Sequence, residues 1–233
     1  MNLRFLKQLR AQTLHHKLML VLSLPMLLWV LSGCYFVWMD LGYIRGDHYV
    51  EPAKYIEINA QSLTFSDIAQ SHTDATKIDL VMIAKEPYYR VFSENGTALI
   101  NANTGKSRAQ LSQAQAVSIT QSIMANKALP FKARLINDNA PNELSPRHLP
   151  VWQVSYEDRV NSTIYISASK GDVVARRHDF WRIFDVFWRI HIMDYDDGAN
   201  VNNWLLFIAT VLALVATVSG IKWQSKRLKR GRI

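Results

Sequence analysis

Two long apolar runs dominate the pattern of hydrophobic and polar positions. Residues 18–39 form twenty-two consecutive positions without a charged side chain, and residues 204–221 form eighteen more. As helices with a rise of about 1.5 Å per residue, these runs would be about 33 and 27 Å long, close to the roughly 30 Å of a hydrocarbon core. The segment between them is polar and mixed, like a globular protein. The pattern therefore predicts two transmembrane helices that flank a globular domain.

Between the two runs, two passages show the same order of signals. Each begins with a stretch suited to a helix start, at Ser62 in the first passage and at Ser112, which would cap a helix reaching Asn126, in the second. In both passages, strand-like segments and a glycine turn follow. The strand-like segments are 78–83, 88–92 and 98–106, which ends in the turn, in the first passage, and 131–136, 151–156 and 163–167 in the second. We therefore predict an α+β fold with two repeats, about 60–108 and 111–176, each a helix on three or four antiparallel strands.

Three shorter segments have patterns of their own. Residues 179–193 place large apolar side chains at helical spacing, which predicts an amphipathic helix in the membrane interface. Residues 137–150 contain three prolines and are expected to be the least structured part, either a contact loop or a tolerated insertion. Residues 194–200 are acidic and turn-like, so they form a loose cation site or a solvated flank. Small residues in the second run would pack on the first run or on a second protomer; they are Ala213, Ala216 and Gly220.

The basic residues are concentrated outside the apolar runs. Residues 1–17 and 222–233 carry ten Lys and Arg and no acid, whereas the middle carries the other seventeen and all nineteen Asp and Glu, so its net charge is −2. Because basic flanks stay in the cytosol, both termini are expected there, with residues 40–203 exported from a two-pass protein of the inner (plasma) membrane. The exported part has no basic excess to neutralise phosphates, so nucleic acid is not an expected partner.

The single cysteine raises an alternative for the first run. Cys34 cannot form an intramolecular disulfide, but residues 31–34 fit a lipoprotein cleavage site. Because the apolar run continues to Met39, we expect a retained anchor, and lipidation stays the alternative. The predicted layout is then a basic N-terminus, a first span, an exported domain, an interfacial helix, a second span and a basic tail, over 1–17, 18–39, 40–178, 179–193, 204–221 and 222–233.

Several segments resemble one protein family. Residues 149–154 and 164–174 are similar to a PepSY repeat, and residues 101–106 resemble a weaker copy of its final strand and turn. Residues 14–33 resemble the opening helix of PepSY-associated transmembrane proteins, with a histidine about one helix length before a small residue and a glycine. The pair Ser219–Gly220 repeats that feature in the second run. The resemblance implies two tandem PepSY units between two transmembrane helices.

The resemblance also implies a cofactor. Reductases of this family hold b-type haem between membrane helices with histidines and pass electrons to ferric iron, which makes His15 and His191 the candidate ligands. In the predicted topology about 30 Å of bilayer separates them, so one haem would need its second axial ligand from another copy or a partner. The other interpretations are a headgroup-facing cluster for His15, with His16 and Lys17 beside it, and an ordinary interfacial helix residue for His191.

Two functions are therefore expected from the sequence. The first is a subunit of an envelope electron-transfer or iron-acquisition system, similar to ferric or siderophore reductases. The alternative is a non-catalytic membrane-anchored binding or regulatory module that recognises another envelope protein. The sequence carries no glycine-rich phosphate cradle, paired zinc ligands or activated-serine elbow, so it names no catalytic residue and no protein-bound metal, and enzymatic activity stays open.

Overall fold

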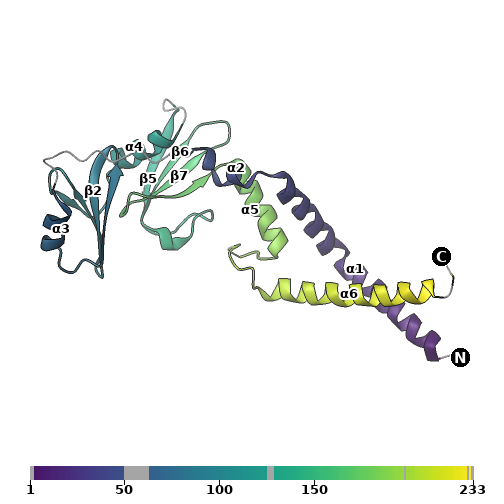
Figure 1. The fold of residues 1–233 in the computed structure, drawn as a ribbon. Helices are drawn as coiled ribbons and strands as arrows, with labels where there is room; N and C mark the ends of the chain where they lie inside the picture. The colour runs from purple at the N-terminus through teal and green to yellow at the C-terminus, as the bar shows by residue number, and fades with distance from the viewer. Residues whose placement is uncertain (1–2, 50–62, 125–128, 197, 230, 232–233) are drawn as a thin grey trace. The chain divides into compact units, whose positions relative to one another are not determined.

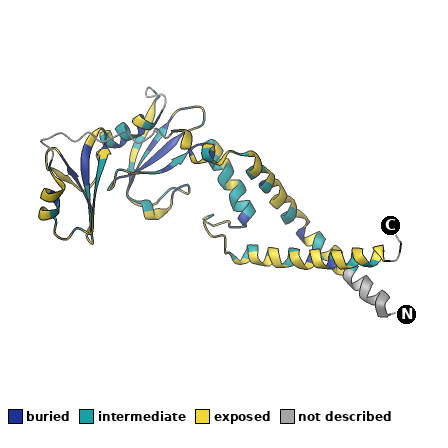
Figure 2. Cartoon of the chain, in the orientation of Figure 1, coloured by how far each residue is buried: buried dark blue, intermediate teal, exposed yellow. Residues whose placement is uncertain are grey.

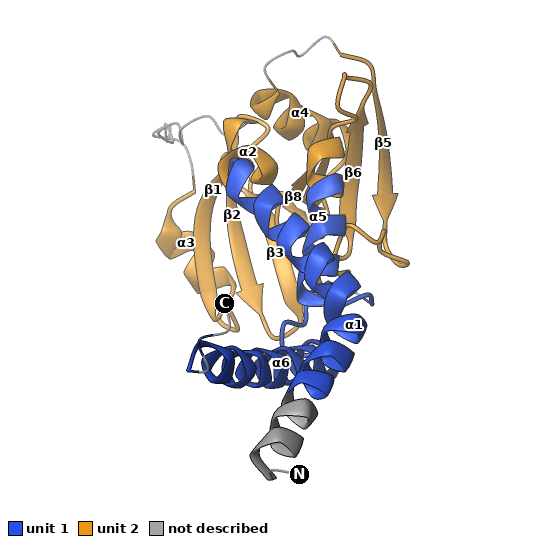
Figure 3. Cartoon of the chain, turned by 90° about the vertical axis from the view of Figure 1, so that its right-hand side faces the viewer, with its two compact units in different colours: residues 1–40, 183–233 blue, residues 41–182 orange. Residues whose placement is uncertain are grey.

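The computed structural model describes residues 3–49, 63–124, 129–196, 198–229 and 231, and for residues 3–11 it describes the backbone only. The chain divides into two compact units (Figure 3). One, the helical unit, consists of residues 1–40 and 183–233, and the other, the α/β unit, consists of residues 41–182.

The helical unit contains two long helices, α1 (Leu3–Trp38) and α6 (Trp204–Leu228), and most of α5 (Asp179–Ile192). Within the described residues, Gln12–Trp38 and Trp204–Leu228 are long and apolar enough to cross a membrane. Only 11% of the most apolar window of each is buried, and exposed positions run along both helices (Figure 2). A helix that exposes apolar side chains over this length suits lipid rather than water.

The small residues of α6 face α1. Ala216 and Ser219 are buried, and so is Leu22 of α1. Gly220 lies so close to α1 that an added Cβ would meet a side chain of that helix. Of the two expected roles for the small-residue face, the structure therefore contains the packing against the first span.

The α/β unit contains two antiparallel sheets of four strands, each in sequential strand order (Figure 1). The first sheet follows helix α3 (Phe65–Ser71) and consists of β1 (Lys77–Ile83), β2 (Glu86–Ser93), β3 (Gly96–Asn101) and β4 (Ser107–Arg108). The second follows helix α4 (Gln113–Ile123) and consists of β5 (Phe131–Ile136), β6 (Val151–Tyr156), β7 (Thr163–Ser167) and β8 (Val173–Arg177). The short elements are α2 (Leu41–Arg45), η1 (Asp47–Tyr49) and η2 (Pro146–His148). The α+β class expected from the sequence is confirmed, and each sheet has a fourth strand, β4 or β8.

Both sheet helices begin with a reciprocal cap. Thr64 caps α3 together with Asp67, and Ser112 caps α4 together with Gln115. In each pair the hydroxyl accepts from the backbone of the third helical residue, whose side chain accepts from the backbone of the cap. Ser112 is the predicted cap, whereas Ser62 lies outside the described residues. Helix α4 ends at Ile123, before the predicted Asn126.

The two sheets repeat one another in their backbone contacts. In each, the leucine before the helix donates its N–H to an alanine after the third strand, at 2.6 Å in the first sheet and 2.8 Å in the second. That alanine donates to a proline carbonyl near the start of the second strand, and a turn glycine donates to the end of the third strand. The equivalent pairs are Leu63 and Leu111, Ala102 and Ala168, Pro87 and Pro150, Gly105 and Gly171, and Asn101 and Ser167. Two copies of one unit therefore build the domain.

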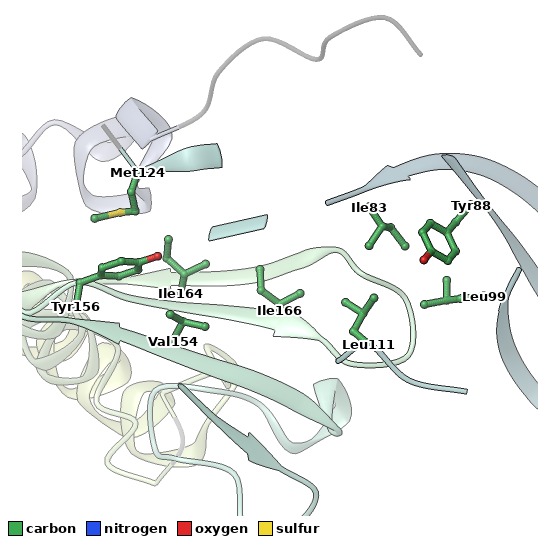
Figure 4. Close-up of a cluster of buried hydrophobic side chains, with 9 residues drawn as sticks. All are labelled: Ile83, Tyr88, Leu99, Leu111, Met124, Val154, Tyr156, Ile164 and Ile166. Carbon is green, nitrogen blue, oxygen red and sulfur yellow. The ribbon is translucent and has the colours of Figure 1, made fainter. Parts of the chain in front are cut away.

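The largest core cluster joins the two sheets (Figure 4). Ile83, Tyr88 and Leu99 come from the first sheet, and Leu111 lies between the sheets in the chain. The other buried members come from α4 or its end and from the second sheet; they are Met124, Val154, Tyr156, Ile164 and Ile166. A second cluster lies beside α3 and contains Ile68 and Tyr89. The sheets are thus held together by apolar packing as well as by the chain.

The loop expected to be least structured is packed instead. Leu144 is buried in a third cluster with Val151 and Tyr165 of the second sheet. The neighbouring Glu143 accepts hydrogen bonds from the Tyr165 hydroxyl and the Arg182 guanidinium, at 2.7 and 2.8 Å. The segment 137–150 contains no strand and only the short η2, as expected, but its packing was not predicted. The second sheet has apolar residues on the face away from α4, and a local proline pattern does not reveal that this face needs a cover.

Candidate functional site

The two candidate histidines both lie in the helical unit, and each contacts a glycine of another helix. His15 belongs to α1 and lies against Gly220 of α6. His191 belongs to α5 and lies against Gly33 of α1. Each glycine follows a serine, Ser219 or Ser32, so each histidine packs on the small-residue pair of a different helix. The sequence shows both pairs but not which histidine meets which pair.

His15 fills the space that Gly220 leaves open. Its Nδ1 lies 2.9 Å from the carbonyl oxygen of Ala216, one helical turn before Gly220. A Cβ added to Gly220 would lie 2.8 Å from Cε1 of the imidazole, so a larger residue there would force the ring to move. The ring also lies beside Trp223, with 6.0 Å between the ring centroids. His15 therefore joins α1 to α6 by a hydrogen bond and by close packing.

His191 joins α5 to α1 in a looser contact. Its Nδ1 lies 2.9 Å from the Ser32 hydroxyl. The imidazole stacks on Trp29 with a centroid separation of 5.4 Å and meets the edge of Phe36 at 5.2 Å. A Cβ on Gly33 would lie 3.7 Å from Cε1, which is ordinary contact. Burial lowers the pKa of His191, which favours the neutral imidazole.

The hydrogen bonds of both imidazoles are made through Nδ1. A carbonyl oxygen can only accept, so Nδ1 of His15 is protonated and donates to Ala216. The Ser32 hydroxyl has one proton and lies 2.8 Å from the Leu28 carbonyl and 3.0 Å from the Trp29 carbonyl of its own helix; when it donates to either carbonyl, its oxygen accepts from Nδ1 of His191. A neutral imidazole that donates through Nδ1 carries its free lone pair on Nε2, the arrangement found in histidines that bind metals.

One chain does not fit a haem held by both histidines. His15 and Ser32, the contact of His191, are seventeen residues apart on α1, which corresponds to about 25 Å along the helix. The apolar cavity between α1 and α6, lined in part by Trp29 and Leu22, has a volume of about 60 Å³ and is too small for a porphyrin. The structure thus gives each histidine the nitrogen chemistry of a ligand but does not bring the two together.

The acidic turn is organised by its own backbone. The buried Asp194 carboxylate accepts N–H bonds from Asp196 and Asn200, at 3.3 and 2.9 Å. Arg189 pairs with Asp185 at 2.8 Å and donates to the Asp196 carbonyl. Within the described residues, no three His, Cys, Asp or Glu side chains are grouped as metal ligands would be. The described residues of the turn therefore contain no preformed ligand set for the expected loose cation site, and Asp197 lies outside them.

A histidine pair in the α/β unit was missed by the sequence analysis. His178 is fully buried, and its Nε2–H donates to the carbonyl of Tyr43 at 3.1 Å. Its Nδ1 is buried and has no hydrogen-bond partner among the described residues. The ring of His48 lies 6.0 Å away between centroids, and burial lowers the pKa of both histidines. No sequence signal links residues 130 positions apart, so only the fold could reveal this contact.

Comparisons with protein-family models, with curated proteins and with solved structures found no match. The PepSY resemblance therefore rests on the sequence alone, and the features that bear on function are the apolar helices, the repeated sheets and the two histidine–glycine contacts.

Proposed function

We propose that this protein is a two-span PepSY-type membrane protein and a subunit of an envelope electron-transfer or iron-acquisition system. The two exposed apolar helices and the basic residues beyond them support a membrane position with both ends in the cytosol. The α/β unit is then exported. The repeated helix-and-sheet contacts support two tandem PepSY units, because the segments that resemble PepSY strands and turns occupy equivalent places in both copies.

The observation that supports the redox role is the hydrogen bonding of the two imidazoles. Each uses Nδ1 in a hydrogen bond to a neighbouring helix, which leaves Nε2 as the candidate axial ligand of a b-type haem. When bound, haem would supply one-electron transfer. His15 and His191 lie too far apart to share one iron, so each would serve a separate haem, with the second ligand from another copy or a partner protein.

An absorption spectrum of the full chain tests this proposal. The protein is purified in mild detergent from cells supplied with iron and reduced with dithionite. We expect a Soret band that shifts on reduction, and His15→Ala or His191→Ala should each remove about half of it, because the two sites are separate. His16→Ala, beside His15 on α1, is the matched control and should keep the full band. Folded but colourless protein, also after incubation with hemin, would rule out the redox role.

The second candidate is a non-catalytic module that recognises another envelope protein. It is favoured by one observation: both histidines already form hydrogen bonds between helices, and this structural role explains their presence without a cofactor. In that case the protein is colourless. His15→Ala and His191→Ala then lower the unfolding temperature in detergent, and the visible absorption spectrum, where aromatic side chains do not absorb, stays unchanged.

A further inference from the structure

A hollow of about 410 Å³ opens between α1 and α6 at the basic end of the helical unit. His15 lines the hollow on the α1 side. Gly220 and Ile221 line it on the α6 side. The remaining lining residues of α6 are Trp223, Gln224 and Arg227. Counted from Gly220, the other three lie three, four and seven residues further along α6. One face of this helix therefore builds this side of the hollow.

The lining offers hydrogen-bond donors that the described part of the chain leaves unpaired. Arg227 lies over the ring of Trp223 at 5.4 Å but has no carboxylate within salt-bridge distance among the described residues. In the same part of the chain, neither the indole N–H of Trp223 nor the Gln224 amide has a hydrogen-bond partner. Three residues with a guanidinium, an indole and an amide thus line one hollow, and none of these groups has an acceptor among the described residues.

The charge at this end of the helical unit is of one sign. Residues 1–39 and 198–233 contain no Asp or Glu, and Arg227 is the cation of α6 that lines the hollow. The apolar run of α6 ends at Ile221, so the hollow lies where a spanning helix leaves the hydrocarbon for the headgroups. An anion is the expected occupant, because an ammonium group would meet only cations here.

We propose that this hollow binds the phosphate of an anionic phospholipid, of the phosphatidylglycerol type. Arg227 donates to the non-ester oxygens of the phosphate, Trp223 and Gln224 add neutral donors, and Ile221 begins the apolar surface on which the acyl chains lie. A lipid is favoured over free phosphate because its chains hold the headgroup at this depth. The inference rests on the membrane position given under the proposed function, but it does not require haem.

Native mass spectrometry of the full chain tests the site. The protein in mild detergent is offered equal amounts of phosphatidylglycerol and phosphatidylcholine, and the bound lipid is read from the mass. We expect preferential binding of phosphatidylglycerol, which Arg227→Gln lowers about fivefold, the factor that one cation near an anionic surface is typically worth. Trp223→Phe removes the indole N–H with little change of shape and should lower binding less.

The matched control is Lys222→Gln, which removes the same charge from the opposite face of α6. It should leave the bound phosphatidylglycerol unchanged. An equal loss in Arg227→Gln and Lys222→Gln would overturn the proposal, because it would show general attraction rather than a site. Displacement of the lipid by millimolar inorganic phosphate would also overturn it and identify free phosphate as the ligand. Because the readout is lipid mass, a colourless protein would refute the haem and leave this result intact.

Discussion

Tyr89 and Trp152 make the same contact in the two sheets. The Tyr89 hydroxyl donates to the carbonyl of Leu63 at 2.9 Å, and the Trp152 indole donates to the carbonyl of Leu111 at 3.0 Å. Each donor stands two residues after the proline of its repeat, and each acceptor is the leucine before its helix. The repeats have thus kept one hydrogen bond with two different side chains, so the position and not the residue type carries the resemblance.

The turn glycine of the second repeat lies where the two sheets pack closely against each other. Gly171 has a φ of +79°, and an added Cβ would lie 2.9 Å from Cδ1 of Ile83 in the first sheet. We expect Gly171→Ala to lower the free energy of unfolding by about 1–3 kcal/mol through backbone strain and this clash. Chemical denaturation measures it. Ile83→Val removes the clashing methyl, so the cost of Gly171→Ala should shrink in that background; additive losses would show that strain alone is responsible.

Glu143 is expected to stabilise the α/β unit through its two partners. The Tyr165 ring is fully buried, burial raises the pKa of its hydroxyl, and that hydroxyl donates to Glu143. Glu143→Ala leaves the buried Tyr165 hydroxyl without its acceptor and leaves Arg182 only Asp179 as an ion-pair partner, which should cost about 1–3 kcal/mol in chemical denaturation. Glu157→Ala is the control, because the Lys132–Glu157 pair is 84% and 58% exposed and should be worth under about 1 kcal/mol. Similar losses in both variants would contradict the prediction.

The two glycines under the histidines should respond differently to the same substitution. Gly220→Ala places a Cβ 2.8 Å from His15, so the ring must move and lose its bond to Ala216. Thermal unfolding in detergent should show a loss of about 0.5–1.5 kcal/mol, the usual net worth of a hydrogen bond. Gly33→Ala places a Cβ 3.7 Å from His191 and should be tolerated. If Gly33→Ala were the more damaging, the assigned packing of the histidines would be wrong.

Acid is expected to destabilise the α/β unit through His178. Burial lowers its pKa below the usual 6.5, and the Tyr43 carbonyl, Arg182 and Asp158 change this shift less. The unfolded chain therefore binds more protons below pH 6.5, so stability is full above that value and falls as the pH drops toward the folded pKa. Denaturation between about pH 5 and 8 measures the slope. His178→Gln should lower the overall stability but flatten this slope, whereas His72→Gln should keep it.

Much of the local structure followed from the sequence. The apolar runs predicted α1 and α6 because a helix in lipid needs about twenty uncharged residues, and this requirement is visible without any contact. Ser112 and the period of 179–193 predicted α4 and α5, because caps and amphipathic faces are local features. The strands of both repeats were found from alternation, except for the short β4 and the edge strand β8.

The sequence by itself therefore determined which segments are helices and strands, that two helices are long and apolar enough for a membrane, and that one unit is repeated. Only the tertiary structure decided which distant residues meet: His15 with Gly220, His191 with Ser32, and His178 with Tyr43. The physical reason is the distance along the sequence over which each effect acts. Propensity, capping and periodicity act over a few neighbouring residues, whereas these contacts join positions more than a hundred residues apart and exist only after the chain has packed.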